Sequence, residues 1–210
     1  MRHNRTALIA ACALLCAAGV VGAQIVSSVT AGATTEEIIA LMQDLEARAE
    51  ATPDDIDVRI ELGNFYYEAN MFEQAEAQYH AVTEMDSTHA GAHLNLGTLY
   101  TDMGRIEEAV EELEIALSLE PENAMIVTNL GSAYYATHRF SDAMDMYRVA
   151  IHLDPDNVEA HFNMGVAFAD AQIFDEAIVE WQRVIEIDPE GTAAEVCRDN
   201  IQMINEFRGE

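Results

Sequence analysis

Residues 90–123 read AGAHLNLGTLYTDMGRIEEAVEELEIALSLEPEN, and the same pattern recurs at a constant interval on both sides of this stretch. A glycine and an alanine each return every 34 residues, at Gly63, Gly97, Gly131 and Gly165 and at Ala75, Ala109, Ala143 and Ala177. A period of this length indicates one supersecondary unit copied in series, in which each copy buries its apolar face against its neighbours. The sequence therefore predicts an α-solenoid.

The interval divides the central part of the chain into four copies, 56–89, 90–123, 124–157 and 158–191. In each copy a leucine or methionine precedes the glycine and an aromatic residue follows it by three. A proline closes every copy except the first, which has Ser87 instead. These residues resemble the pattern of the tetratricopeptide repeat family. The resemblance implies an all-α superhelix of antiparallel helix pairs.

The spacing inside one copy predicts how its two helices pack. Leu-Gly-x-x-Tyr places its residues on one face of a first helix, and Ala-x-x-x-aromatic-x-x-Val/Ala does the same for a second helix. The two faces must pack against each other. We expect the glycine and the alanine to leave no side chain at the closest approach, with large residues filling the space on either side.

Two further helices are predicted at the ends of the array. Residues 36–52 form a flanking helix that covers the first repeat, with Thr34 or Thr35 as its cap and an apolar stripe of Ile38, Leu41, Leu45 and Ala49. Residues 192–210 lack the Leu-Gly-x-x-Tyr pattern, and we interpret them as a capping helix. Its apolar stripe holds Ala194, Cys197, Ile201, Ile204 and Phe207.

The amino terminus is of a different kind. Arg2 and Arg5 precede an unbroken apolar run from Ala7 to Ala23, which ends in small residues suited to signal peptidase. We interpret residues 1–23 as a signal peptide and 24–35 as a linker; the alternative is an uncleaved membrane anchor that reaches to about residue 29. Both interpretations place the repeats outside the cytoplasm, in the periplasm or the extracellular space.

The chain is strongly acidic, with 38 acidic residues against 10 arginines, no lysine and a formal net charge of −28. Electrostatic binding to nucleic acid or to an anionic membrane surface is excluded, because counterion release needs a cationic face. Contact with a membrane is therefore expected only through the N-terminal segment, if it stays uncleaved. The acidity suits either a saline habitat or the recruitment of a basic partner, and the sequence leaves both open.

In the family, one stripe of each first helix lines a concave groove that binds partners. This stripe lies at positions 2, 5, 9, 12 and 13 of each copy, and we call it the groove face. A row of apolar residues across stacked helices forms a patch suited to a protein or peptide, unless part of it packs against the flanking helices. The predicted binding residues are Asp57, Ile60, Asn64, Tyr67, Leu94, Thr98, Thr101, Met125, Ser132, Tyr135, Glu159, Phe162 and Val166.

One binding mode of the family is disfavoured by these residues. Some tetratricopeptide domains hold a partner's terminal carboxylate with two asparagines and several basic residues. Asn64 and Asn95 occupy the asparagine places, but Ile60, Met125 and Asn129 stand where this clamp needs cations. A carboxylate would meet no positive charge there.

The sequence gives little support for catalysis, and we predict a protein that is not an enzyme and needs no cofactor. Paired carboxylates carry no information in so acidic a chain, and no phosphate loop or nucleophile elbow is present. His89 and His93 are four residues apart, a spacing that suits metal ligands. However, His93 and His161 occupy a place where the family carries a large packing residue, so a structural role is the preferred interpretation.

These features together predict a non-catalytic scaffold outside the cytoplasm that holds an extended or helical segment of another protein. Leu41 to Gly63 also resembles the start of the repeat domains in cytochrome c maturation factors, which implies assembly of exported proteins such as c-type cytochromes. The alternative is a structural solenoid that stacks on copies of itself to form an oligomer or a coat. The polar outer face expected of the last helix argues against end stacking.

Overall fold

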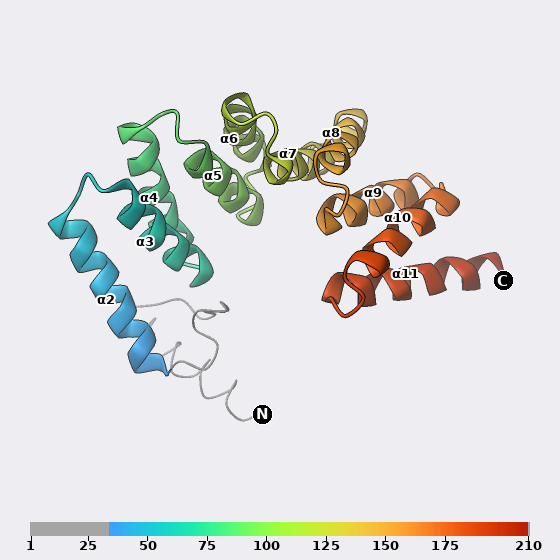
Figure 1. Ribbon diagram of the computed structural model, residues 1–210, viewed down its shortest axis with the longest axis horizontal. Coiled ribbons are helices and arrows are strands. Elements are labelled where there is room, and N and C mark those ends of the chain that lie inside the picture. Colours follow the sequence, from blue (N-terminus) through green and yellow to red (C-terminus); the bar gives the residue numbers. More distant parts are fainter. Residues whose placement is uncertain (1–33, 210) are drawn as a thin grey trace. The chain divides into compact units, whose positions relative to one another are not determined.

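The computed structural model describes residues 34–209, so the predicted signal peptide or anchor and most of the predicted linker lie outside the described residues. The described part is built of helices without a strand, which confirms the predicted all-α solenoid fold (Figure 1). No helix in residues 34–209 is long and apolar enough to cross a membrane. The helices are α2 (Thr35–Ala51), α3 (Ile56–Glu68), α4 (Phe72–Met85), α5 (Ala90–Asp102), α6 (Ile106–Leu119), α7 (Ala124–Ala136), α8 (Phe140–Leu153), α9 (Val158–Asp170), α10 (Phe174–Ile187) and α11 (Thr192–Arg208).

The helices form two compact units, which meet in the sequence between Met103 and Gly104. In the first unit, α2 packs on α3, α3 pairs with α4, and α5 packs on α4. In the second unit, α6 packs on α7, α7 pairs with α8, and α9 pairs with α10. The last helix, α11, contacts both α9 and α10. The first, third and fourth repeats are therefore each a helical hairpin.

The first helix of each repeat begins at a capping residue that returns every 34 residues. The side chains of Asp55, His89, Asn123 and Asn157 each accept a hydrogen bond from a backbone N–H of the first turn. This bond satisfies a donor that the helix itself leaves open.

The flanking helix α2 begins with a reciprocal cap. The N–H of Glu37 donates to the Thr34 hydroxyl at 3.3 Å, and the N–H of Thr34 donates to the Glu37 carboxylate at 2.7 Å. The hydrogen bonds from Thr34 lower the pKa of Glu37. On the buried side of α2, Met42 is 5% exposed while the predicted Leu41 is only half-buried.

The turn inside each repeat contains one residue with left-handed backbone geometry, again at intervals of 34. These residues are Asn70, Gly104, His138 and Gln172, with φ angles of 57°, 74°, 61° and 61°. In the first repeat the N–H of Met71 donates to the carbonyl of Tyr66 at 2.8 Å, and the third and fourth repeats have the equivalent bond. This is the closure of a Schellman motif, which ends the first helix and turns the chain into the second.

The glycines of the first, third and fourth repeats lie beneath aromatic rings of the second helices, which identifies large side chains that fill the space beside each glycine. A Cβ atom would come within 2.6 Å of the Tyr79 ring at Gly63 and within 2.7 Å of the Tyr147 ring at Gly131. At Gly165 it would overlap with the Trp181 indole nitrogen. The glycine is needed because a ring already fills the space that a side chain would take.

The capping helix α11 closes the core of the second unit. Cys197 and Ile204 of α11 cluster with Ala177, Trp181 and Val184 of α10. Burial raises the pKa of the Cys197 thiol to about 11, so this cysteine behaves as a small buried hydrophobe.

Phe207 departs from the predicted buried stripe of α11. Its side chain is 79% exposed. The Phe207 ring lies edge-on to the Phe174 ring, with 5.9 Å between the ring centroids. It follows that the last turn of α11 extends past the core that the rest of the helix covers.

Candidate protein-binding surface

The groove face of the first unit is made by α3 and α5. Ile60, Tyr67 and Leu94 are half-buried there, and Asp57 is exposed. The Tyr67 hydroxyl donates to the carboxylate of Asp102, at the end of α5. This bond holds the ring across two successive first helices.

The polar residues of this face are engaged with the protein itself. The side-chain oxygen of Asn64 accepts hydrogen bonds from the Tyr79 hydroxyl at 2.8 Å and from the Asn95 amide at 3.2 Å. Thr98 and Thr101 donate to carbonyls of their own helix at 3.0 and 2.9 Å. The two asparagines at the clamp positions therefore bind each other.

The groove face of the second unit is made by α7 and α9, and it repeats the tyrosine–aspartate bond. The Tyr135 hydroxyl donates to Asp170, which follows it by 35 residues as Asp102 follows Tyr67. Burial raises the pKa of Tyr135 to about 12, so the hydroxyl keeps its proton and donates. Ser132 accepts a hydrogen bond from the Asn163 amide at 3.0 Å.

The remaining predicted residues of the second unit differ in their exposure. Met125 is 60% exposed and Glu159 is also exposed. Phe162 and Val166 are half-buried and pack against the cluster formed by α10 and α11. The Phe162 carbonyl also accepts a hydrogen bond from the Trp181 indole at 3.2 Å. Part of the apolar row thus packs on the chain's own helices, while Met125 is exposed and Tyr135 is half-buried.

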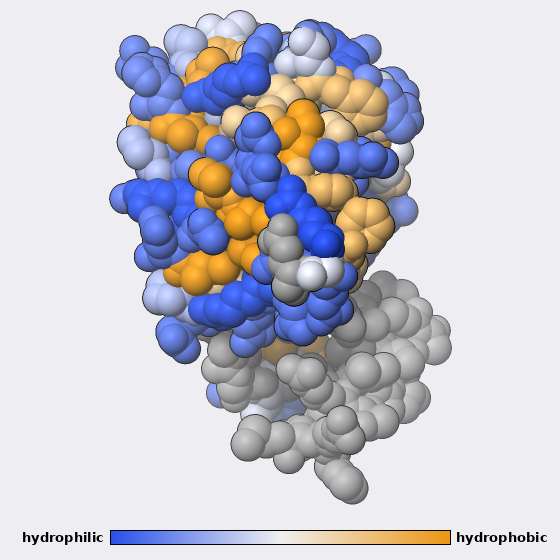
Figure 2. All heavy atoms as spheres, turned by 90° about the vertical axis from the view of Figure 1, so that its right-hand side faces the viewer, coloured by the Kyte–Doolittle hydropathy of each residue, from blue (hydrophilic) through white to orange (hydrophobic). Residues whose placement is uncertain are grey.

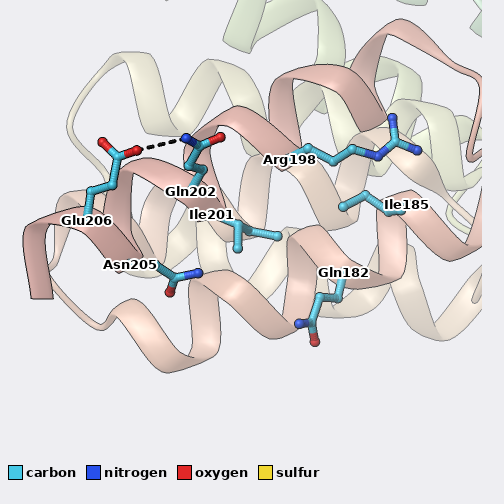
Figure 3. A pocket seen from close by; sticks show the side chains of 7 residues that line it. All are labelled: Gln182, Ile185, Arg198, Ile201, Gln202, Asn205 and Glu206. Atoms are coloured by element: carbon cyan, nitrogen blue, oxygen red, sulfur yellow. Dashed lines mark hydrogen bonds between the residues drawn. The ribbon is translucent and has the colours of Figure 1, made fainter. Parts of the chain in front are cut away.

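A hollow between α10 and α11 marks the end of the array. Arg198 and Gln202 of α11 stand at the positions that hold Leu62 and Tyr66 in the first repeat. Polar groups therefore replace the residues that a first helix uses to pack a second one. Gln202 donates to Glu206 at 2.8 Å. The hollow is lined by Gln182, Ile185, Arg198, Ile201, Gln202, Asn205 and Glu206 (Figure 3).

The histidines considered as metal ligands make structural contacts. His89 caps α5 by accepting from the N–H of Ala92 at 3.0 Å. His93 is 6% exposed, and its Nε2 lies 3.2 Å from the carbonyl of Ser87. Within residues 34–209, no group of three or more His, Cys, Asp or Glu side chains is arranged to hold a metal ion.

His161 and Glu180 predict a pH-dependent stability of the fourth repeat. The Nδ1 of His161 lies 2.6 Å from the Glu180 carboxylate and its Nε2 lies 3.2 Å from the Pro155 carbonyl. Both neighbours are acceptors, so both ring nitrogens must donate, as they do only in the protonated imidazole. The bond to Glu180 raises the pKa of His161, although burial and Arg183 oppose the shift. This stabilisation is full below pH about 6.5 and is lost as the pH rises through the raised pKa.

We therefore expect His161→Gln to flatten part of the fall in unfolding free energy that urea titrations of the wild type show as the pH rises above about 6.5. The matched control is His152→Gln, which changes an exposed histidine of α8 and should leave the slope unchanged. A wild-type slope in the His161→Gln variant would show that this pair does not titrate in that range.

The chain matches the family model of the tetratricopeptide repeat over residues 60–118, 94–157 and 128–192. These matches span more than half of its length, and the chain belongs to the tetratricopeptide repeat family. No curated protein sequence matches it.

Solved structures share the fold. MamA is 20% identical, with a TM-score of 0.65 over 74% of this chain and 91% of MamA. YrrB, described as a tetratricopeptide protein with an unusual peptide-binding site, is 26% identical, with a TM-score of 0.59 over 75% of this chain and 84% of YrrB. The first repeat domain of Spaghetti (RPAP3), solved with the HSP90 peptide SRMEEVD bound, is 24% identical. Its TM-score is 0.54, over 60% of this chain and 97% of that domain.

Sequence reasoning missed two exposed groove-face positions on α11. Val196 and Met203 follow Phe162 and Ala169 by 34 residues, yet α11 lacks the glycine pattern by which the repeats were aligned. Continuing the 34-residue register past the last repeat would have found them.

Proposed function

We propose that this protein is a non-catalytic scaffold that binds a peptide or helix of a partner protein on the groove faces of its repeats. The observation that carries the proposal is the pair of equivalent tyrosine–aspartate bonds, which holds Tyr67 and Tyr135 across successive first helices. A ring fixed in this way offers apolar area at little cost in side-chain entropy, as binding surfaces require. The fold shared with YrrB, which has a peptide-binding site, supports the same conclusion.

The partner we propose is apolar, with basic residues around its anchors. Met125, Tyr135 and Leu94 supply apolar contact area, while Asp57 and Glu159 place carboxylates at the edges of the two faces. Such a charge pattern raises the association rate and selects against acidic competitors, while the apolar contacts supply most of the affinity.

The test replaces two apolar residues of the groove face, the exposed Met125 and the half-buried Tyr135, by serine. It measures capture of partner proteins from the native envelope fraction at matched salt. We expect at least a tenfold loss of the captured proteins, since a few apolar anchors carry most of the energy of an interface. The control is the double variant Met85→Ser with Val149→Ser, because these side chains are 39% and 41% exposed and lie outside the groove face. It should capture as much as the wild type.

Two outcomes would contradict this proposal. A folded Met125→Ser, Tyr135→Ser variant with unchanged capture would place the binding surface elsewhere. A variant that captures normally but no longer sediments as an oligomer would favour the alternative, a solenoid that assembles with its own copies. Circular dichroism establishes in both cases that the variant is folded.

We also propose export from the cytoplasm, with assembly of exported proteins such as c-type cytochromes as one specific task. The support is the basic start and apolar run of residues 1–23. Mass spectrometry of the protein from its native source tests this: a mature chain that begins at Gln24 means cleavage, and an intact Met1 in the membrane fraction means an anchor. Intact protein in the cytosolic fraction would contradict export.

A further inference from the structure

The last helix carries an exposed apolar row, of which Phe207 also touches Phe174 of α10 edge-on. Val196, Met203 and Phe207 of α11 are 45%, 67% and 79% exposed. Figure 2 faces the side on which α11 ends, and apolar spheres gather on this face between hydrophilic ones. Since α11 has 17 residues where α3, α5, α7 and α9 have 13, Phe207 lies on a turn that these first helices lack.

The spacing of this row is that of a coiled-coil seam. Val196, Asn200, Met203 and Phe207 follow one another at intervals of four, three and four residues, the alternation of a and d positions that lets two helices pack along each other. We call these four residues the α11 seam. Asn200 takes an a position, where a single asparagine fixes the register of a helix pair.

The charges beside the seam select its occupant. Asp199 and Glu206 flank it on one side, at the positions where coiled coils carry charges that choose the partner. On the other side, Cys197 and Ile204 are buried in the core. The arginines of α11 are engaged elsewhere, with Arg198 donating to the Pro189 carbonyl and Arg208 to Asp175.

A second copy of the chain does not suit this surface. Antiparallel pairing of two α11 helices would bring Asp199 and Glu206 of the two copies together, and like charges there are destabilising. Each copy also carries a net charge of −28, which opposes self-association at moderate salt.

We propose that the α11 seam binds an amphipathic helix of a partner protein that presents apolar residues at a and d positions and lysine or arginine beside them. Val196, Asn200 and Met203 continue the groove-face register of α9 by one helix. The proposal therefore rests on the proposed function, whose binding surface it extends to α11.

The probe is a synthetic peptide of three heptads with leucine at a and d, one asparagine at an a position and lysine at e and g. The lysines keep the peptide from pairing with itself. A second peptide with glutamate at e and g is its control. Fluorescence anisotropy with the full-length protein at 0.15 M salt should show micromolar binding of the lysine peptide and at least tenfold weaker binding of the glutamate peptide.

Met203→Glu tests the seam, and Val179→Glu is its matched control, since Val179 of α10 is 60% exposed and outside the seam. Both variants add one negative charge, so long-range attraction of the lysine peptide changes equally. We expect Met203→Glu to weaken lysine-peptide binding at least tenfold and Val179→Glu to change it less than twofold. Absence of binding to the wild type, or equal binding to both variants, would overturn the proposal.

Two further results separate this proposal from the proposed function. In one outcome, the Met125→Ser, Tyr135→Ser variant loses its captured partners, but the Met203→Glu variant binds the lysine peptide with the affinity of the wild type. Binding on the groove face is then supported, and binding on the α11 seam is refuted. If sedimentation shows a wild-type dimer that Met203→Glu dissociates, the occupant is a second copy, and the proposal is overturned.

Discussion

Replacement of Gly131 by leucine is expected to lower the free energy of unfolding by about 3 kcal/mol, at the upper end of what overpacking usually costs. Even a Cβ atom at this position would lie 2.7 Å from the Tyr147 ring and 3.2 Å from the Cβ of Met146. Both neighbours belong to α8, so α7 and α8 must move apart to accept a leucine. Thermal melting followed by circular dichroism should show a drop of roughly 6–12 °C.

The control for this prediction is Ala136→Leu, which adds leucine to the same helix at an exposed position. It should change the free energy of unfolding by less than about 0.5 kcal/mol. Equal melting temperatures for the Gly131→Leu variant and the wild type would mean that α7 and α8 do not pack through this glycine.

Replacement of Trp181 by alanine is expected to cost about 3–5 kcal/mol, the usual range for emptying a buried aromatic site. The ring is 3% exposed, covers Gly165 and contributes to the cluster that joins α10 to α11. Because repeat arrays are stabilised by contacts between neighbours, the loss should be concentrated in the fourth repeat. Hydrogen exchange should show α9, α10 and α11 opening at lower free energy than α7.

Trp181→Leu separates loss of volume from loss of the aromatic ring. The second repeat already has Leu113 at the same place in the 34-residue register, so this variant should retain more stability than Trp181→Ala. Val179→Ala changes an exposed neighbour in α10 and should be close to neutral. Uniform loss of protection across all the helices after Trp181→Ala would contradict a local effect.

Much of the fold could be predicted because the packing requirement repeats with the sequence. A constant interval places glycine, aromatic and alanine residues on fixed helical faces, and those faces admit one pairing. The identity of the group above each glycine could not be derived, since spacing gives the face of a helix and not the direction of a ring. In the first, third and fourth repeats, Tyr79, Tyr147 and Trp181 fill that space.

The candidate site was harder to predict for the same physical reason. Position in the register shows that Phe162 and Met125 share the groove face, but their exposure depends on which helix lies beside them. Phe162 packs against the cluster formed by α10 and α11, while Met125 is 60% exposed.

The exposed apolar row of α11 was not predicted, because the composition of the last helix indicated a polar outer face. Val196, Met203 and Phe207 contradict that expectation.

The hydrogen bonds between helices have a consequence for how the chain folds. Tyr66 donates to Glu46 and Tyr134 to Glu114, each 20 residues back in the sequence, and the tyrosine–aspartate bonds join residues 35 apart. Because these contacts join residues near each other in the sequence, forming them closes only small loops and costs little entropy. A low contact order of this kind is associated with fast folding. Folding of such an array can begin at any hairpin and spread to its neighbours. A chain that is synthesised from its N-terminus can therefore fold one repeat at a time, before its last helix has been completed.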